Sequence, residues 1–503
     1  PVLIGPEAEW QEVVGVDLPK VFFSPQKYSY GHLWGTSVLL SETLQVDLLS
    51  INRWLLPIVW SLVMPLILFR IGYLLFGTKR KGLWLIWLSF LAFPFQVLGS
   101  LTLPVSLGYM LFLFSLMLWL QYLRDDNKYQ KYLAILFSTL MLFSYSLAFI
   151  LIWLVILISW FLKKILNEKF YIARDKIGKF IWQALLFSIL AFVFPVIELV
   201  SGISYVPYKI EWWNNIKQLL GQFTGWFYAS AIRPHDILSG NILFNHTPDY
   251  AFVSSIFNSW RWWIIPFSIL IWSLTKFGFF KALKDNLSWK VMLGLVYTVF
   301  GGYIIGWFIL SGDRLFTRRM DLVFSFLIIV FLTFSLQTIL QKLKLKKIYL
   351  KLIVLFFVII FSWFTTISYA SGPDMRVIST SEYQAADYVW SQSQEGCVLA
   401  DTWFLLALEA KSAGGVVGGG FPIDYQFGQT ERVKLFNKFT KNPEAEDLIK
   451  IKKLANLESC LFIQKSESFT EQNLDKINEI FVQDPKLVSG MFVWSLNLKK
   501  EVE

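Results

Sequence analysis

Charged residues are scarce in this sequence of 503 amino acids, where they make up 16% of the chain against 55% for hydrophobic residues. Ordinary soluble domains carry roughly 25% charged residues. Such a low charge content excludes a chain that is solvated by water over most of its surface. It indicates instead that a lipid bilayer is the main solvent of the protein.

Cysteine and histidine are also rare, with two cysteines and three histidines in the whole chain. These few side chains cannot form a Cys/His metal cluster without carboxylates. The metal is therefore unknown, and a divalent cation held by carboxylates is one alternative. Cys397 and Cys460 both lie in the polar C-terminal part, so a disulfide and a pair of buried thiols both stay open.

An initiator methionine and a signal peptide are missing, because the chain begins with Pro1 and an acidic stretch. We therefore expect an N-terminally truncated or processed chain. The net charge of +10 does not indicate a nucleic-acid partner, since much of the lysine and arginine lies in short clusters between apolar runs.

The apolar residues are concentrated in long runs, and crossing a hydrocarbon core takes roughly 20 of them. The runs are 54–76, 83–99, 101–123, 180–201, 261–279, 291–311, 322–340 and 352–370. A further run, 132–162, has one polar break at Ser144–Ser146, which predicts a hairpin of two short helices. The sequence thus predicts a polytopic α-helical membrane protein with about ten transmembrane helices.

Positive charge sets the expected orientation of these helices. Five basic clusters follow or separate the apolar runs, at residues 79–81, 124–131, 163–179, 276–290 and 342–351. Basic clusters of this kind stay in the cytoplasm. The prediction is an integral, multi-pass protein of a prokaryotic plasma membrane, with residues 1–50 as a first extracytoplasmic loop, 51–370 as the membrane domain with an outer loop 202–260, and 371–503 as an extracytoplasmic domain.

The composition changes after Ala370, where apolar runs give way to short alternating elements. Helices are expected at 380–394 and 402–412, and strands at 397–401, 416–421, 459–464 and 492–496. Strands that alternate with helices predict a C-terminal α/β domain. Within the spans ionisable residues are scarce, with Arg70 and Glu198 near helix ends, which disfavours a transporter.

Three groups of residues on the outer side could carry chemistry. Glu7 and Glu9 are carboxylates that could act as a general base or contact a metal, or could belong to a solvated polar terminus. Lys27, Tyr28, Tyr30 and His32 could bind a phosphate and a sugar ring, or anchor the chain at the interface. The third group, Arg314, Arg318 and Arg319, could bind an anionic ligand or lipid headgroups.

Several stretches of the first 77 residues resemble the membrane-embedded GT-C glycosyltransferases, above all the aminoarabinose-transferase and protein O-mannosyltransferase branch. The stretches are PEAEWQEVV, SPQKYSYGHLWG and NRWLLPIVWSLVMPLILFRIGYLLFG. Glu7 and Glu9 match the family's acidic motif, although they form Glu-Ala-Glu and not an adjacent Asp-Glu. Lys27 matches a basic residue near the donor phosphate, and Arg318 or Arg319 a basic position before a late transmembrane helix.

The resemblance implies an enzyme, a glycosyltransferase with a polyprenyl-phosphate sugar as donor and a lipid, glycan or protein as acceptor. In such an enzyme Glu7 or Glu9 would deprotonate the acceptor hydroxyl. The alternative from another class is a non-catalytic membrane scaffold, or a polysaccharide-export component, whose outer domain binds a partner.

Overall fold

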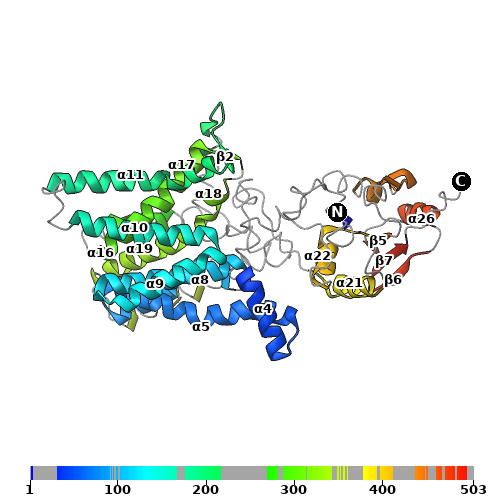
Figure 1. The fold of residues 1–503 in the computed structure, drawn as a ribbon, viewed down its shortest axis with the longest axis horizontal. Coiled ribbons are helices and arrows are strands. Elements are labelled where there is room, and N and C mark those ends of the chain that lie inside the picture. The colour runs from blue at the N-terminus through cyan, green and yellow to red at the C-terminus, as the bar shows by residue number, and fades with distance from the viewer. Residues whose placement is uncertain are drawn as a thin grey trace. The chain divides into compact units, whose positions relative to one another are not determined.

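In the computed structural model the chain divides into two units, one of residues Tyr28–Met375 and the other of Pro1–Lys27 with Arg376–Glu503. Figure 1 shows the chain coloured from blue at the N-terminus to red at the C-terminus. The structure describes residues 2–3, 31–90, 102–166, 176–213, 269–280, 287–312, 314–342, 378–392, 397–411, 437–447, 460–466, 471–481 and 484–495, together with single residues and pairs between some of these ranges.

The larger unit is a bundle of helices. They are α4 (Gly31–Leu44), α5 (Leu48–Phe76), α6 (Lys79–Ser89), α8 (Pro104–Asp125), α9 (Lys128–Leu140), α10 (Ser146–Leu166), α11 (Lys176–Val200), α16 (Leu287–Val296), α17 (Gly302–Ile309), α18 (Leu315–Arg319) and α19 (Asp321–Lys342). A 3₁₀ turn, η1 (Met141–Phe143), precedes α10, and a π-helical turn, η3 (Tyr297–Gly301), joins α16 to α17. Helix α5 packs on α6 and α8, while α11 packs on η3 and α17.

Helix α5 shows how the sequence sets the ends of these long helices. The Asp47 carboxylate accepts a hydrogen bond from the Ser50 N–H at 3.2 Å, which satisfies a donor of the first turn. At the other end Gly77 adopts a left-handed conformation with φ of 76°, and its N–H donates to the Tyr73 carbonyl. Glycine reaches this conformation without steric cost, so the helix stops there.

Within the described residues, four helices are long and apolar enough to cross a membrane, at Ser50–Phe76, Pro104–Asp125, Ser146–Lys163 and Leu287–Ile309. Shorter apolar segments lie at Leu185–Val200 within α11, at Val323–Ile339 within α19 and at Ile269–Phe280. The prediction of about ten transmembrane helices is therefore corrected to four in this part of the chain. The predicted run 352–370 lies largely outside the described residues.

Two of the predicted spans differ for local reasons. Only the first part of the run 83–99 lies in α6, which has 11 residues, begins at Lys79 and ends at Ser89. The run 132–162 does break where the sequence predicts, since η1 and Ser144 separate α9 from α10. However, α9 has only 13 residues, so α10 alone is long enough to span. Hydropathy records apolar content and shows neither the end of α6 nor the short length of α9.

The surface of the helix bundle that faces away from its core is apolar. On α5 the side chains of Trp54, Ile58, Leu62 and Leu66 recur every fourth residue, and each is more than half exposed. Helix α11 repeats the pattern through Ile181 to Val200. Apolar surface of this extent is costly in water and is compatible with contact with lipid chains. The chain is a membrane protein by the length, composition and surface of these helices.

Glycine allows two helices of the bundle to approach closely. A Cβ atom added at Gly82 of α6 would lie 2.6 Å from the Phe69 carbonyl oxygen of α5, and one added at Gly72 would lie 2.8 Å from the Gly82 Cα. Small residues at such crossings allow backbones to touch, which is the usual source of helix association in membranes.

We therefore expect Gly82→Ala to destabilise the bundle by about 2 kcal/mol, because the helices must separate to admit the methyl group. The melting temperature of the purified protein in detergent measures the effect. The control is Gly35→Ala on α4, where an added Cβ meets no atom within 4 Å. Equal melting temperatures for the two variants would contradict the proposed close packing.

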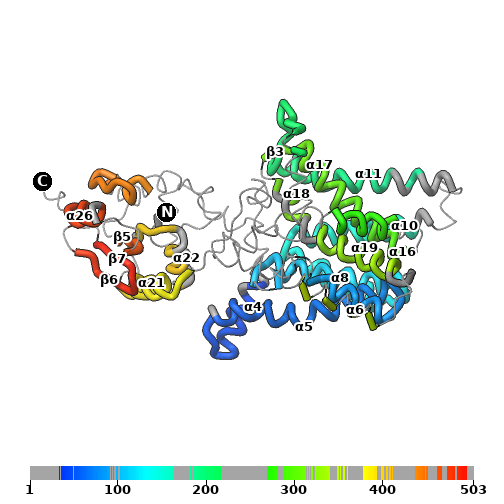
Figure 2. Tube along the Cα trace, turned by 180° about the vertical axis from the view of Figure 1, so that it is seen from behind, coloured from blue at the N-terminus to red at the C-terminus, as the bar shows by residue number. Residues whose placement is uncertain are grey.

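The smaller unit contains a five-stranded sheet in the order β1-β4-β5-β7-β6. Figure 2 labels three of its strands, β5, β6 and β7. Its strands are β1 (Val2–Leu3), β4 (Cys397–Leu399), β5 (Cys460–Lys465), β6 (Lys486–Val488) and β7 (Met491–Ser495). Strands β4 and β5 are parallel and the other pairs are antiparallel. Helices α21 (Thr380–Gln392), α22 (Thr402–Lys411) and α26 (Glu471–Ile480) complete the unit.

Strand alternation gives this sheet two buried faces. Ile463 pairs with Val493, and both belong to the core that α21 and α22 form against one face. The next pair, Phe462 and Trp494, stacks with Phe481, and Phe439 contacts Phe462 edge-on. The predicted α/β arrangement is confirmed for the described residues, while the strand expected at 416–421 lies outside them. Val2 and Leu3, in the predicted first loop, form the edge strand.

Cys397 and Cys460 are register partners on the parallel strands β4 and β5. Neighbouring strands lie about 4.8 Å apart, which is within the range of Cα separations that a disulfide bridges. The choice between a disulfide and two thiols stays a prediction.

A buried carboxylate fixes the start of α21. Glu382 is fully buried, and it accepts hydrogen bonds from the Ser379 N–H at 2.8 Å and from the Lys465 ammonium at 2.9 Å. In return the Ser379 hydroxyl accepts from the Glu382 N–H, which completes a capping box. Burial alone would raise the pKa of Glu382, but these hydrogen bonds lower it from 4.5 to about 2.

The lowered pKa predicts a pH-dependent stability for this unit. A carboxyl with a lowered pKa in the folded state stabilises it above the unfolded pKa of 4.5, and loses that effect as the pH falls toward 2. We expect Glu382→Gln to cost at most about 3 kcal/mol at pH 7 and much less near pH 2.

Hydrogen exchange of the β5 and β7 amides in the whole protein measures the effect, with wild type and variant compared at each pH so that intrinsic exchange cancels. The control is Glu446→Gln, which removes an exposed pair with Lys450 in the same unit. A difference between wild type and Glu382→Gln that did not change with pH would refute the lowered pKa.

Candidate functional site

The structure describes only part of the predicted site. Glu7, Glu9, Lys27, Tyr28 and Tyr30 lie outside the described residues. His32 lies in the first turn of α4. Arg318 and Arg319 lie on α18, and Arg314 is the residue that directly precedes this helix. The three predicted arginines therefore lie together in one short segment, residues 314–319, which we call the arginine turn.

That turn is attached to a buried carboxylate, Glu198, near the C-terminal end of α11. Glu198 is fully buried. Its Oε2 accepts a hydrogen bond from the Ser204 hydroxyl at 2.9 Å, and its Oε1 accepts one from the Thr317 N–H at 2.6 Å. One carboxylate thus connects three segments that lie up to 119 residues apart in the chain.

The chain returns to Glu198 through two short strands. After α11, Gly202 adopts φ of 70°, which turns the backbone away from the helix. Strand β2 (Ser204–Tyr205) then pairs with β3 (Ser311–Gly312), with Ser204 opposite Gly312. This pairing places the Ser204 hydroxyl beside both the carboxylate and the start of the arginine turn.

Arg314 is held by its backbone and by its side chain. Its N–H donates to the Ser204 hydroxyl at 3.0 Å, and its Nε donates to the Leu310 carbonyl at 2.6 Å. The guanidinium carbon lies 4.7 Å from the centre of the Trp307 ring, which is a cation–π contact. Because only 8% of Arg314 is exposed, the residue anchors the turn from within the protein.

The backbone of Arg314 is strained. It has φ of 48° and ψ of 42°, the left-handed region that residues with a Cβ rarely adopt. Such a conformation costs roughly 1–2 kcal/mol and persists only where the surroundings impose it. Here the surroundings are Glu198, Ser204 and Leu310. Three other described non-glycine residues, Gln45, Asp126 and Ser489, also adopt a positive φ, so at Arg314 this conformation reflects the contacts that hold the turn.

A glycine of α17 completes the packing around the turn. The Thr317 side chain lies directly against Gly306, and an added Cβ at that glycine would collide with the threonine hydroxyl oxygen. Helix α17 also accepts a hydrogen bond, at the Phe308 carbonyl, from the Asn215 side chain at 3.0 Å. The turn is therefore packed against α11 and α17.

The site holds a segment with three arginines in a fixed position. Within the described part of the chain no group of three or more histidine, cysteine or acidic side chains could hold a metal ion. Both Glu198 oxygens accept hydrogen bonds from neutral protein groups, so we assign this carboxylate to structure and not to proton transfer. What the site presents is a fixed turn that carries two further arginines after Arg314.

The sequence indicated Glu198 as a rare charged residue near a helix end, but predicted no role for it. Ser204 was not among the predicted site residues. The signal for Glu198 was present, because a lone carboxylate in an apolar run is expensive and needs a partner. The signal for Ser204 was absent, since a serine after a helix end is common. Its role depends on the pairing of β2 with β3.

Comparisons with known proteins add little to this description. No family model and no curated protein matches the sequence. One solved structure that resembles the chain is the Archaeoglobus fulgidus oligosaccharyltransferase in complex with Zn and sulfate, with 12% identity and a TM-score of 0.49. The match covers 92% of this chain and 64% of that one. At this identity and TM-score the likeness carries no argument about activity.

The hydrogen bonds of Glu198 lead to a prediction. Glu198→Ala leaves a buried N–H at Thr317 and a buried hydroxyl at Ser204 without their acceptor, at a cost of about 2–4 kcal/mol. Glu198→Gln keeps an oxygen for the Thr317 N–H and should cost much less. Thermal unfolding in detergent compares the two variants.

The matched control is Ser201→Ala, which removes a hydroxyl bonded only within the end of α11, to Ile197 and Glu198 carbonyls. If Glu198→Gln destabilised the protein as much as Glu198→Ala, the negative charge would matter more than the acceptor geometry. The assignment of Glu198 as a hydrogen-bond acceptor would then be wrong.

Proposed function

We propose that this protein is a membrane glycosyltransferase that moves a sugar from a polyprenyl-phosphate-linked donor to a lipid, glycan or protein acceptor on the outer face of the membrane. The observation that carries the proposal is the arginine turn, a strained cationic segment fixed by Glu198 beside the end of an apolar helix. Helix ends in a membrane protein lie near the headgroups, where a lipid phosphate is found.

The three arginines have different roles in this proposal. Arg314 is buried and fixed by its own contacts, so it contributes positive charge from beneath the turn. Arg318 and Arg319 follow on α18 and contact the donor phosphate, because arginine forms paired hydrogen bonds with phosphate oxygens. Lys27, Tyr28, Tyr30 and His32 complete the proposed donor site, with the aromatic rings against the sugar.

The proposed reaction is a single displacement. Glu7 or Glu9 removes the proton of the acceptor hydroxyl, whose oxygen attacks the anomeric carbon of the donor sugar. The bond from that carbon to the phosphate oxygen breaks, and polyprenyl phosphate leaves with the electron pair. The configuration of the sugar is inverted. Cations at the phosphate stabilise the charge that develops there, which is commonly the largest catalytic contribution.

The test is transfer of sugar from a polyprenyl-phosphate donor by the purified protein in lipid vesicles. We expect Glu7→Gln or Glu9→Gln to lower kcat about 10²–10⁴-fold, since the base is lost. Replacing Arg318 and Arg319 by Gln should mainly raise KM for the donor. Glu42→Gln, an exposed carboxylate of α4, is the control and should transfer at the wild-type rate.

Full transfer by the Glu7→Gln, Glu9→Gln double variant would refute the assignment of the base. The alternative function is a non-catalytic scaffold or export component whose α/β unit binds a partner. The five-stranded sheet with its own core is the observation that favours it. A chain that transfers no sugar from any donor, but loses its cellular role when the α/β unit is removed, would support that alternative.

A further inference from the structure

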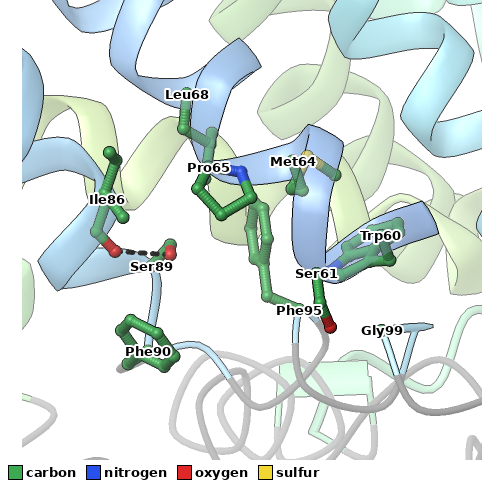
Figure 3. Close-up of a pocket in the computed structure, with 10 residues that line it drawn as sticks. All are labelled: Trp60, Ser61, Met64, Pro65, Leu68, Ile86, Ser89, Phe90, Phe95 and Gly99. Atoms are coloured by element: carbon green, nitrogen blue, oxygen red, sulfur yellow. Dashed lines mark hydrogen bonds between the residues drawn. The ribbon is translucent and has the colours of Figure 1, made fainter. Parts of the chain in front are cut away.

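The helical unit contains a half-open pocket of about 290 Å³, distant in sequence from the arginine turn. Ten residues from α5, α6 and the segment after α6 line it (Figure 3). Its volume is at the lower limit of small-molecule sites, so it admits one slender ligand and not a whole lipid.

The lining selects an apolar ligand. Its side walls are large hydrophobic residues, among them Trp60, Met64 and Phe95. The two hydroxyls of the lining are already used, because Ser61 donates to the Pro57 carbonyl at 2.7 Å and Ser89 to the Ile86 carbonyl at 2.6 Å. A polar ligand would lose its hydrogen bonds to water and find few replacements, whereas a hydrocarbon chain loses none.

The position of the pocket along α5 excludes headgroups. The candidate span runs from Ser50 to Phe76, and the pocket residues of α5 run from Trp60 to Leu68, around its midpoint. At 1.5 Å per residue they lie about 15–27 Å from Ser50, along a span of about 40 Å. Only hydrocarbon chains occupy the centre of a bilayer core that is about 30 Å thick.

The mouth of the pocket opens beside the lipid-facing surface. Ser61 is exposed at the rim, and Phe90 on the opposite side is 46% exposed. Leu62 and Leu66, next to the rim on α5, belong to the exposed apolar stripe. Bilayer lipids are the solvent of that stripe, so their chains reach the opening at far higher concentration than any rarer apolar compound.

We propose that this pocket binds one acyl chain of a membrane phospholipid. The chain end enters at the depth of Ser61 and packs against Trp60 and Met64, with its headgroup at the interface. This lipid is distinct from the sugar donor and makes no use of the arginine turn, so the proposal does not depend on the glycosyltransferase function.

The experiment uses the whole protein in phosphatidylcholine vesicles that contain a phosphatidylcholine with a photoreactive diazirine at the end of one acyl chain. After irradiation, mass spectrometry locates the crosslinks. We expect labelling at Met64 or Phe95 as well as on the exposed Leu62 and Leu66. Ser61→Phe blocks the mouth and should lower pocket labelling about tenfold, as expected when about two buried methylene groups are lost.

Leu62→Phe is the matched control, since it places the same ring on the stripe but outside the pocket; it should leave labelling at Met64 unchanged. Ser89→Leu fills the pocket from the α6 side and should repeat the effect of Ser61→Phe. A parallel sample contains a diazirine-bearing farnesyl phosphate. If only that probe labelled the pocket, or if neither filling variant changed the labelling by the phospholipid, the proposal would be overturned.

Discussion

The hydrogen bonds of Glu198 are the constraint on which the arginine turn depends. A carboxylate buried at the end of an apolar helix costs several kcal/mol unless its oxygens find donors. The donors come from Ser204 and Thr317, which belong to segments that meet only because β2 pairs with β3. The same serine accepts the Arg314 N–H, so the strained arginine conformation and the buried carboxylate stabilise one another.

The bilayer imposes the second constraint, which has opposite effects on the surface of the bundle and on its interior. Outside, large apolar side chains are exposed because lipid solvates them, as on α5 from Trp54 to Leu66. Inside, lipid gives no hydrophobic advantage to burial, so close packing must hold the helices, as at Gly72 and Gly82. The apolar pocket lies between the packed interior and the lipid-facing surface. Its walls are packed side chains, and its mouth lies beside the exposed stripe.

The sequence predicted what depends on local composition. Helices α5 and α8 and the strands β4, β5 and β7 follow from apolar runs and their breaks. The number of spans was overestimated, because hydropathy shows neither that α6 ends at Ser89 nor that α9 has only 13 residues. Pairings between distant segments, such as Val2 with Leu399 and Ser204 with Gly312, leave no local signal, so the edge strand and the Glu198 contacts were not predictable.

Glu198 and Glu382 are both buried carboxylates that need hydrogen-bond donors, and they find them in different surroundings. Each is fully buried, and each accepts a backbone N–H, from Thr317 and from Ser379, so that it fixes the first residues of a helical segment. Glu382 also binds the Lys465 ammonium, which lowers its pKa and ties its effect to pH. Glu198 instead accepts from a hydroxyl and an amide N–H, so it fixes the arginine turn through neutral donors.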